Sequence, residues 1–191
     1  MKPQPTALPE RSSTERSAAS SSTSDRKVAK VFGLDGEGWM RHANAASVWT
    51  RFAGLSILSL AIWSRDWIGL WCLIPVTLAL VWMFVNPRFF RPPKSTRNWA
   101  SRSVLGERIW VNRDKIALPE QFRSRASSLV ANIYSTIGMG FLAFGLFDLN
   151  ILATVTGLLI THGGKAWYLD RVTLLFAEMK DRSPEYASWD Y

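Results

Sequence analysis

The sequence of 191 residues is poor in the side chains on which most metal and redox sites are built. It contains one cysteine, Cys72, and two histidines, His42 and His162. A single cysteine excludes an intramolecular disulfide and a cysteine-based zinc cluster. The sequence also lacks a phosphate-binding glycine loop and the common serine and cysteine nucleophile motifs. We therefore predict no cofactor, no resident metal and no catalytic residue.

Large apolar side chains are scarce in the first 27 residues, which are rich in serine, threonine and proline. Such a segment cannot bury enough apolar surface to offset its chain entropy, so the sequence predicts a disordered tail over residues 1–27. The segment also lacks the apolar stretch of a secretory signal peptide.

Charge is nearly absent from four apolar runs, and this absence indicates membrane spans. A helix needs about 20 apolar residues to cross the hydrocarbon core. The predicted transmembrane helices cover about residues 46–64, 67–85, 129–147 and 150–169. The first reaches this length only if it includes residues 46–51, with Arg51 extending to the interface. The second contains Pro75, which predicts a kink.

Short polar links pair these spans into two tight hairpins. Arg65 and Asp66 separate the first two spans, and residues 147–150 separate the last two. In the central polar segment, 86–128, the sequence predicts a short helix over 98–106, with Asn98 as N-cap and Gly106 as its C-terminal stop. Alternating apolar residues over 107–120 predict a small β-hairpin at the membrane surface.

The predicted fold class is therefore an all-α integral membrane protein with four transmembrane helices. Its membrane domain covers residues 28–180, and a short C-terminal tail covers 181–191.

The basic residues predict how this domain is oriented. If all four runs cross the membrane, 22 of the 23 lysines and arginines lie on one side, and only Arg65 lies on the other. The positive-inside rule places the basic side in the cytoplasm. We thus expect an inner-membrane protein with both termini cytoplasmic, facing an anionic leaflet. The net charge of +8 does not indicate nucleic-acid binding, because no nucleic-acid module is recognisable.

A polar cluster follows the fourth apolar run and suggests an inward-facing surface. His162 lies past the middle of the predicted span, where polar side chains need a partner inside the bundle. Ala153, Gly157 and Thr161 recur every fourth residue, a spacing that lets a neighbouring helix approach closely. Asn132, Thr136 and Gly140 predict a similar face on the third span.

Three stretches together resemble a family of small, uncharacterised, mainly bacterial multi-pass membrane proteins. The stretches are WMRHAN with SVWTRF (39–52), NWASRSVLGERIWVNR (98–113) and GKAWYLDR (164–171), with the patterns RHAN, NWxSxxVLGER and GKxWxxDR. The likeness extends from about Val31 to Met179. The resemblance implies a helical membrane protein and carries no established activity.

These observations favour a non-enzymatic binding or interaction protein with a polar patch on the cytoplasmic side. The patch would hold either an anionic headgroup or a structural network. Its predicted members are Arg41, His42, Asn44, Glu107, Arg108, His162, Lys165, Asp170 and Arg171.

Two alternatives remain open. One is a small transporter or channel component, a homo-oligomer with His162 on a path lined by Asn132, Thr136 and Thr161. The other is a membrane enzyme or metal site that uses His42 and His162 together with a carboxylate.

Overall fold

The computed structural model describes residues 23–27, 29, 34, 36–124 and 126–191. Within these ranges every regular element is a helix. In chain order the elements are α2 (Gly36–His42), α3 (Ala45–Trp63), α4 (Arg65–Ile68), the 3₁₀ helix η1 (Gly69–Cys72), α5 (Leu73–Phe89), α6 (Trp99–Val111), α7 (Glu120–Arg123), α8 (Ala126–Phe147), α9 (Ile151–Met179), the 3₁₀ helix η2 (Lys180–Arg182) and α10 (Pro184–Ala187). Residues 23–27, at the end of the predicted tail, are also helical, whereas residues 1–22 of that tail lie outside the described residues.

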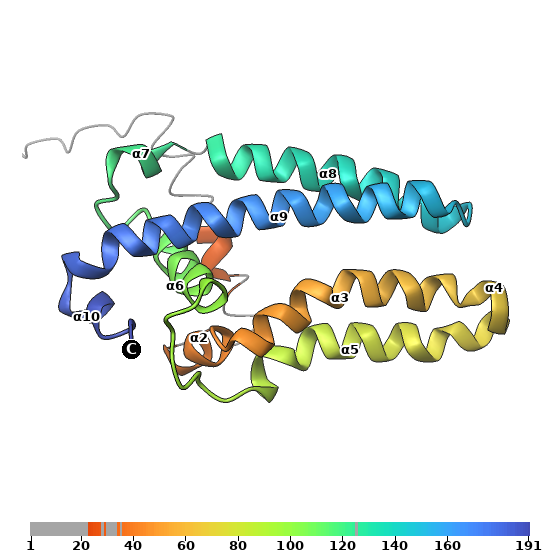
Figure 1. The fold of residues 1–191 in the computed structure, drawn as a ribbon, viewed down its shortest axis with the longest axis horizontal. Coiled ribbons are helices and arrows are strands. Elements are labelled where there is room, and N and C mark those ends of the chain that lie inside the picture. Colours follow the sequence, from red (N-terminus) through yellow and green to blue (C-terminus); the bar gives the residue numbers. More distant parts are fainter. Residues whose placement is uncertain (1–22, 28, 30–33, 35, 125) are drawn as a thin grey trace, which may run out of the picture.

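Four long helices form two antiparallel hairpins that lie side by side (Figure 1). One hairpin consists of α3 and α5, and the other of α8 and α9. Both hairpin turns lie at the same end of the molecule, which we call the turn end. The opposite end, which we call the packed end, contains α2, α6, α10 and the second half of α9. The pairing of the helices agrees with the pairing predicted from the sequence.

The two turns differ in length. In the first hairpin, α4 and η1 follow α3, and the chain bends at Gly69, whose φ of 57° suits glycine. Regular helix resumes only at Leu73, so Pro75 falls in the first turn of α5, where a missing N–H is tolerated. The second turn is short, with Leu149 at a φ of 51° and the Asn150 side chain accepting a hydrogen bond of 2.9 Å from the Ala153 N–H.

Two helical segments among the described residues are long and apolar enough to cross a membrane, Ala45–Phe89 and Glu120–Phe147. This result differs from the four spans that the sequence predicted. The first segment contains both α3 and α5, which run antiparallel in Figure 1. Helix α9 is not among the two; the polar residues His162, Lys165 and Asp170 interrupt its apolar sequence.

Glycines allow α8 and α9 to lie in close contact. A Cβ atom on Gly138 would be 2.3 Å from the Thr161 hydroxyl, and one on Gly157 would be 2.4 Å from the Leu142 backbone nitrogen. The predicted small-residue face of α9 at Gly157 and Thr161 therefore meets α8. The predicted face of α8 is wrong: a Cβ on Gly140 would meet nothing within 4 Å.

The buried apolar core lies at the packed end. Its fully buried large side chains come from α6 and α9, namely Leu105, Ile109, Leu175 and Phe176. Asn98 caps α6 as predicted, accepting a hydrogen bond of 2.9 Å from the Ser101 N–H.

Two predictions for the central segment are wrong. Helix α6 does not stop at Gly106 but continues to Val111, and residues 107–120 contain no strand. The reason is tertiary: a Cβ on Gly106 would lie 1.8 Å from the Val172 carbonyl oxygen, so this glycine lets α6 pack directly on the α9 backbone. The alternating residues predicted as a strand instead bury Ile109 and Val111 at that contact.

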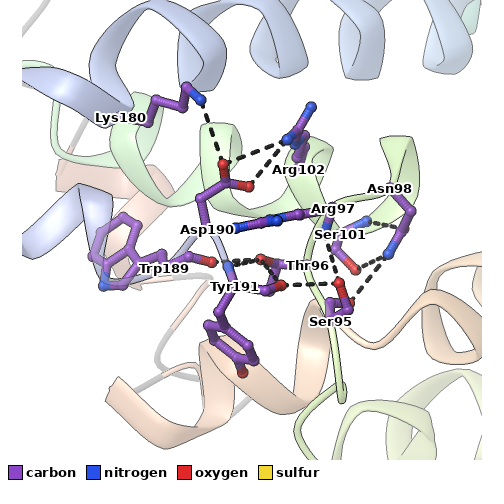
Figure 2. Close-up of polar contacts among 10 residues, drawn as sticks. All are labelled: Ser95, Thr96, Arg97, Asn98, Ser101, Arg102, Lys180, Trp189, Asp190 and Tyr191. Atoms are coloured by element: carbon purple, nitrogen blue, oxygen red, sulfur yellow. Dashed lines mark hydrogen bonds and ion pairs between the residues drawn. The ribbon is translucent and has the colours of Figure 1, made fainter.

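The C-terminal residues hold the loop before α6 in place (Figure 2). The Thr96 hydroxyl donates a hydrogen bond of 2.6 Å to the Trp189 carbonyl, and the Thr96 N–H donates one of 2.8 Å to the Tyr191 carbonyl. Asp190 lies 3.1 Å from Arg102 and 3.4 Å from Lys180. Because these contacts join the loop, α6 and the end of α9, they fix the position of α6 against α9 at the packed end.

Candidate functional site

A cavity of about 720 Å³ lies where the two hairpins meet the packed end; we call it the inner cavity. Residues of α2, α3, α5, α6, α8 and α9 line it together with residues of the N-terminal segment. Its lining is Asp25, Ala29, Leu34, Trp39, His42, Arg51, Met83, Pro87, Glu107, Trp110, Arg113, Ser128, Leu129, Asn132 and Tyr168. Charged and apolar side chains are thus combined in one space.

Arg51 is held by the junction between α2 and α3. Its Nε donates a hydrogen bond of 3.1 Å to the Ser47 carbonyl, and its Nη2 donates one of 2.9 Å to the His42 carbonyl. Its Nη1 contacts the imidazole of His42. These contacts fix a positive charge at the wall of the cavity, about two turns inside the first long helix.

His42 remains neutral in this position. Burial, followed by the positive charges of Arg51 and Lys165, lowers its pKa from 6.5 to about 2. The Trp39 ring packs edge-on against the imidazole, with 5.9 Å between the ring centroids. An imidazole with so low a pKa is a poor general base at neutral pH, because catalysis works best with a pKa near the working pH.

Glu107 supplies a negative charge from α6. It is only partly exposed, and no described residue forms a hydrogen bond or ion pair with its carboxylate. Burial raises its pKa, while the nearby charges of Arg51 and Lys165 act in the opposite direction. Glu107 therefore lines the cavity, and the described residues leave the hydrogen-bonding capacity of its carboxylate unused.

Two residues of α9 complete this group. Lys165 lies beside the lining, with its ammonium 5.6 Å from the centroid of the Phe52 ring, and it interacts electrostatically with Glu107 and His42. Tyr168, one turn further along α9, lines the cavity and interacts electrostatically with Glu107. Within the described part of the chain, neither side chain has a hydrogen bond or an ion pair.

An ion pair between Arg113 and Asp25 forms another part of the cavity wall. Arg113 Nη1 lies 2.8 Å from Asp25 Oδ2, and the guanidinium stacks on Trp110 at 4.8 Å. The other charges that the described residues place at or beside the lining are those of Arg51, Glu107 and Lys165, which leaves one excess positive charge when Glu107 is ionised.

His162 is part of a different contact. Its two ring nitrogens lie 2.8 Å from the Leu158 carbonyl and 3.0 Å from the Phe52 carbonyl, and the Phe52 ring packs on the imidazole at 4.9 Å. This histidine joins α9 to α3 and does not line the inner cavity. Asn132, by contrast, does line it, so the residues of the predicted transport path are not all found together.

The other predicted site residues lie outside the cavity lining. Arg41 pairs with Glu37 at 3.1 Å, and Asp170 pairs with Arg171 at 3.0 Å. Arg108 stacks on Trp189 at 4.0 Å. Asn44 caps α3 and donates a hydrogen bond of 2.9 Å to the Arg91 carbonyl. Of the nine residues predicted for the patch, only His42, Glu107 and Lys165 come together.

Sequence reasoning missed several residues of the cavity. Arg51 was expected only to reach the membrane interface, and Tyr168 was not selected. Tyr168 follows Lys165 by three residues in a helical stretch, so the two share a helix face, and this spacing was a usable signal. The pairing of Asp25 with Arg113 had no local signal, since 88 residues separate them.

The described part of the chain contains no group of three or more His, Cys, Asp or Glu side chains that could hold a metal ion. His42 and His162 belong to the separate contacts given above, so the two-histidine site considered from the sequence has no geometric support among these residues.

Comparison with known proteins gives one match. No curated protein and no solved structure matches this chain. A family model does match, over residues 23–189, which includes every residue of the inner cavity. The family is described as a family of unknown function, in agreement with the resemblance noted from the sequence. The chain therefore belongs to the Family of unknown function (DUF6653).

Proposed function

We propose that this chain is a four-span membrane protein that binds the anionic headgroup of a membrane lipid in its inner cavity, without catalysing a reaction. The observation that carries the proposal is the cavity itself. Its described lining combines Arg51, Glu107 and the Arg113–Asp25 ion pair with apolar walls where the two hairpins meet the packed end, and Lys165 adds a positive charge beside that lining.

Exposed apolar side chains support a membrane location for the hairpins. Only 11% of the most apolar part of Ala45–Phe89, and 22% of that of Glu120–Phe147, is buried. Core helices of water-soluble proteins bury their apolar residues. Here Leu60, Leu78 and Leu152 are 64%, 64% and 75% exposed. Burial of this surface in lipid removes it from water.

The same argument extends to α9. Its first half packs closely against α8 through Gly157, and its exposed residues there include Leu152 and Leu159. A helix so closely paired with a spanning helix would lie at the same depth. Four crossings follow: α3, α5, α8 and the first half of α9.

The charge distribution supports the orientation. The turn end holds Arg65, whose guanidinium donates to the Leu146 carbonyl and, at 2.6 Å, to the Phe147 carbonyl, joining the two turns. The other basic residues that the structure describes belong to the packed end or to the segments leading into it. By the positive-inside rule, the packed end and both termini are cytoplasmic.

The position of the cavity favours an amphiphilic ligand. Met83 on α5 and Leu129 on α8 line it from opposite hairpins, and Leu129 is 60% exposed. In the proposed topology these residues lie at the cytoplasmic edge of the hydrocarbon layer. A headgroup beside Arg51 and Lys165 would have its acyl chains against these apolar residues, so a lipid fits better than a free phosphate.

The test is lipid retention. The full chain is reconstituted in nanodiscs of phosphatidylcholine containing a minor fraction of phosphatidylglycerol, released from them, and examined by native mass spectrometry. We expect one phosphatidylglycerol retained per chain. Lys165→Gln is expected to lower retention about tenfold, the effect of losing one charge-assisted hydrogen bond.

The matched control is Lys94→Gln, which removes an exposed cation that does not line the cavity and should leave retention unchanged. Glycerol 3-phosphate added in place of lipid separates the two sources of phosphate. Retention of phosphatidylglycerol no greater than that of phosphatidylcholine would refute the proposal, as would equal losses in the two lysine variants.

A further inference from the structure

Two hydrogen-bonding groups of the inner cavity are not explained by an anionic ligand alone. Glu107 repels an anion, and Tyr168 adds a hydroxyl that no other described residue uses. Both residues line the cavity that the headgroup would enter. A ligand that satisfies them must carry hydrogen-bond donors as well as a negative charge.

We infer that the lipid bound in the inner cavity has a phosphodiester headgroup bearing free hydroxyl groups, such as a glycerol or another polyol. This inference rests on the proposed function. The phosphodiester would bind beside Lys165 and Arg51, and a hydroxyl of the polyol would donate to Glu107. Tyr168 would exchange hydrogen bonds with a second hydroxyl.

The charge balance distinguishes this headgroup from a phosphomonoester. Among the described residues, Arg51 and Lys165 supply two positive charges, Glu107 supplies one negative charge, and Arg113 is paired with Asp25. One negative charge on the ligand therefore balances this described group. A phosphomonoester carries a charge of about −1.5 to −2 at neutral pH, and the excess would face Glu107 without a partner.

The same groups discriminate against headgroups with an amine. An ammonium could pair with Glu107, but both Arg51 and Lys165 act on that carboxylate and would repel a third cation placed between them. A hydroxyl donates a hydrogen bond to the carboxylate and brings no charge. Neutral donors thus suit this position better than charged ones.

The aromatic and amide side chains of the cavity walls also suit a polyol. Trp39 and Trp110 are almost fully buried and line the cavity on the side of α2 and α6. Flat apolar rings of this type pack against the carbon faces of polyols, leaving the hydroxyls free for polar partners. Asn132, which lines the cavity from α8, offers both a donor and an acceptor.

The experiment is a competition in the same nanodiscs. Phosphatidylglycerol, phosphatidic acid and phosphatidylethanolamine are present in equal amounts in phosphatidylcholine, and the lipids retained by the full chain are counted by native mass spectrometry. We expect phosphatidylglycerol to be retained about tenfold more than either competitor, the effect of one hydrogen bond to a charged group.

Two variants test the assigned roles. Glu107→Gln should reduce retention of phosphatidylglycerol and increase that of phosphatidic acid, because the amide no longer repels a dianion. Tyr168→Phe keeps the ring and should reduce retention of phosphatidylglycerol alone, which keeps the test valid if the first variant fails to fold. Glu185→Gln, an exposed acid outside the cavity lining, should leave the ratio unchanged.

The outcomes separate this inference from the proposed function. Equal or greater retention of phosphatidic acid or phosphatidylethanolamine, with both anionic lipids still above phosphatidylcholine, would overturn the polyol assignment and leave headgroup binding intact. An unchanged lipid ratio in both the Glu107 and the Tyr168 variants would also overturn it. The absence of any preference over phosphatidylcholine would overturn the proposed function instead.

Discussion

Large apolar side chains are mostly exposed along the hairpins toward the turn end and mostly buried at the packed end of this molecule. Along the hairpins the largest apolar side chains point outward, as with Leu60, Leu70 and Leu152. At the packed end they point inward, and Leu105 and Phe176 are completely buried. A chain placed in a single solvent would have no reason for this inversion, because burial of apolar surface stabilises only what water would otherwise contact. The comparison supports the proposed membrane location, in which lipid would surround the hairpins and water the packed end.

Helix α9 passes through both regions, so the same change from exposed to buried apolar side chains occurs along one helix. In its first half Leu159 is 70% exposed, and in its second half Leu175 and Phe176 are buried in the core that α9 forms with α6. The change of environment occurs between them, close to His162 and Lys165. In the proposed topology the inner cavity would therefore lie at the boundary between the two solvents, where an amphiphile would also lie.

The largest expected effect comes from breaking the packed end. Gly106→Ala places a methyl group 1.8 Å from the Val172 carbonyl oxygen, so α6 and α9 must separate. We expect a loss of about 3 kcal/mol in the free energy of unfolding, at the upper end of overpacking effects. Thermal unfolding of the purified protein in detergent measures it. Gly163→Ala, where the new Cβ meets nothing within 4 Å, is the control and should not destabilise; equal losses in both variants would contradict the assigned contact.

A charge placed on each half of α9 tests the two solvents. Leu159→Asp would put a carboxylate into hydrocarbon at a cost of about 3 kcal/mol. Leu174→Asp makes the same change on the other half, where the leucine is 44% exposed and water would face it, so we expect a change within about 0.5 kcal/mol. The measurement is the fraction of each variant recovered in the membrane. Similar recovery of the two variants would show that lipid does not surround the first half.

A smaller effect concerns Glu107 at the boundary. Because its pKa is raised by burial, the folded protein is favoured while this group is protonated, below its ordinary pKa of 4.5, and this contribution is lost as the pH rises through the raised value. The charged groups around it are Arg51, Lys165 and Asp25.

Glu107→Gln should therefore be more stable than the parent protein at neutral and alkaline pH, and the difference should shrink as the pH falls. Unfolding temperatures of both proteins across this range give the comparison. A difference that grows as the pH falls would reverse the assigned sign.

The sequence predicted the parts of this structure that depend on solvent and on local geometry. The apolar runs, their pairing and the Asn98 cap follow from composition and from residues close in sequence. The β-hairpin over 107–120 failed because alternation of apolar residues also suits a helix that is buried on several sides, and only the contact of Gly106 with α9 decides between them. The small-residue face of α8 failed for a related reason, since Gly138 and Gly140 are both available and the sequence does not show which one faces α9.

The candidate site was predicted only in part. His42, Glu107 and Lys165 are polar residues that stand out near apolar runs, and they do come together. His162 stands out equally, yet its two ring nitrogens lie within hydrogen-bond distance of two backbone carbonyls, which no side-chain pattern reveals. Asp25 and Arg113 meet through the fold alone.

The central claim is that lipid separates the two ends of the molecule, and labelling of single cysteines tests it most directly. Cys72 is the only cysteine, so its replacement by alanine gives a cysteine-free background. In that background, cysteine is introduced at Asp66 in the turn end or at Ser188 in the packed end, both exposed positions. A membrane-impermeant maleimide is then applied to intact cells. The account predicts that D66C is labelled at once and that S188C is labelled only after lysis; labelling of both in intact cells, or the reverse pattern, would contradict it.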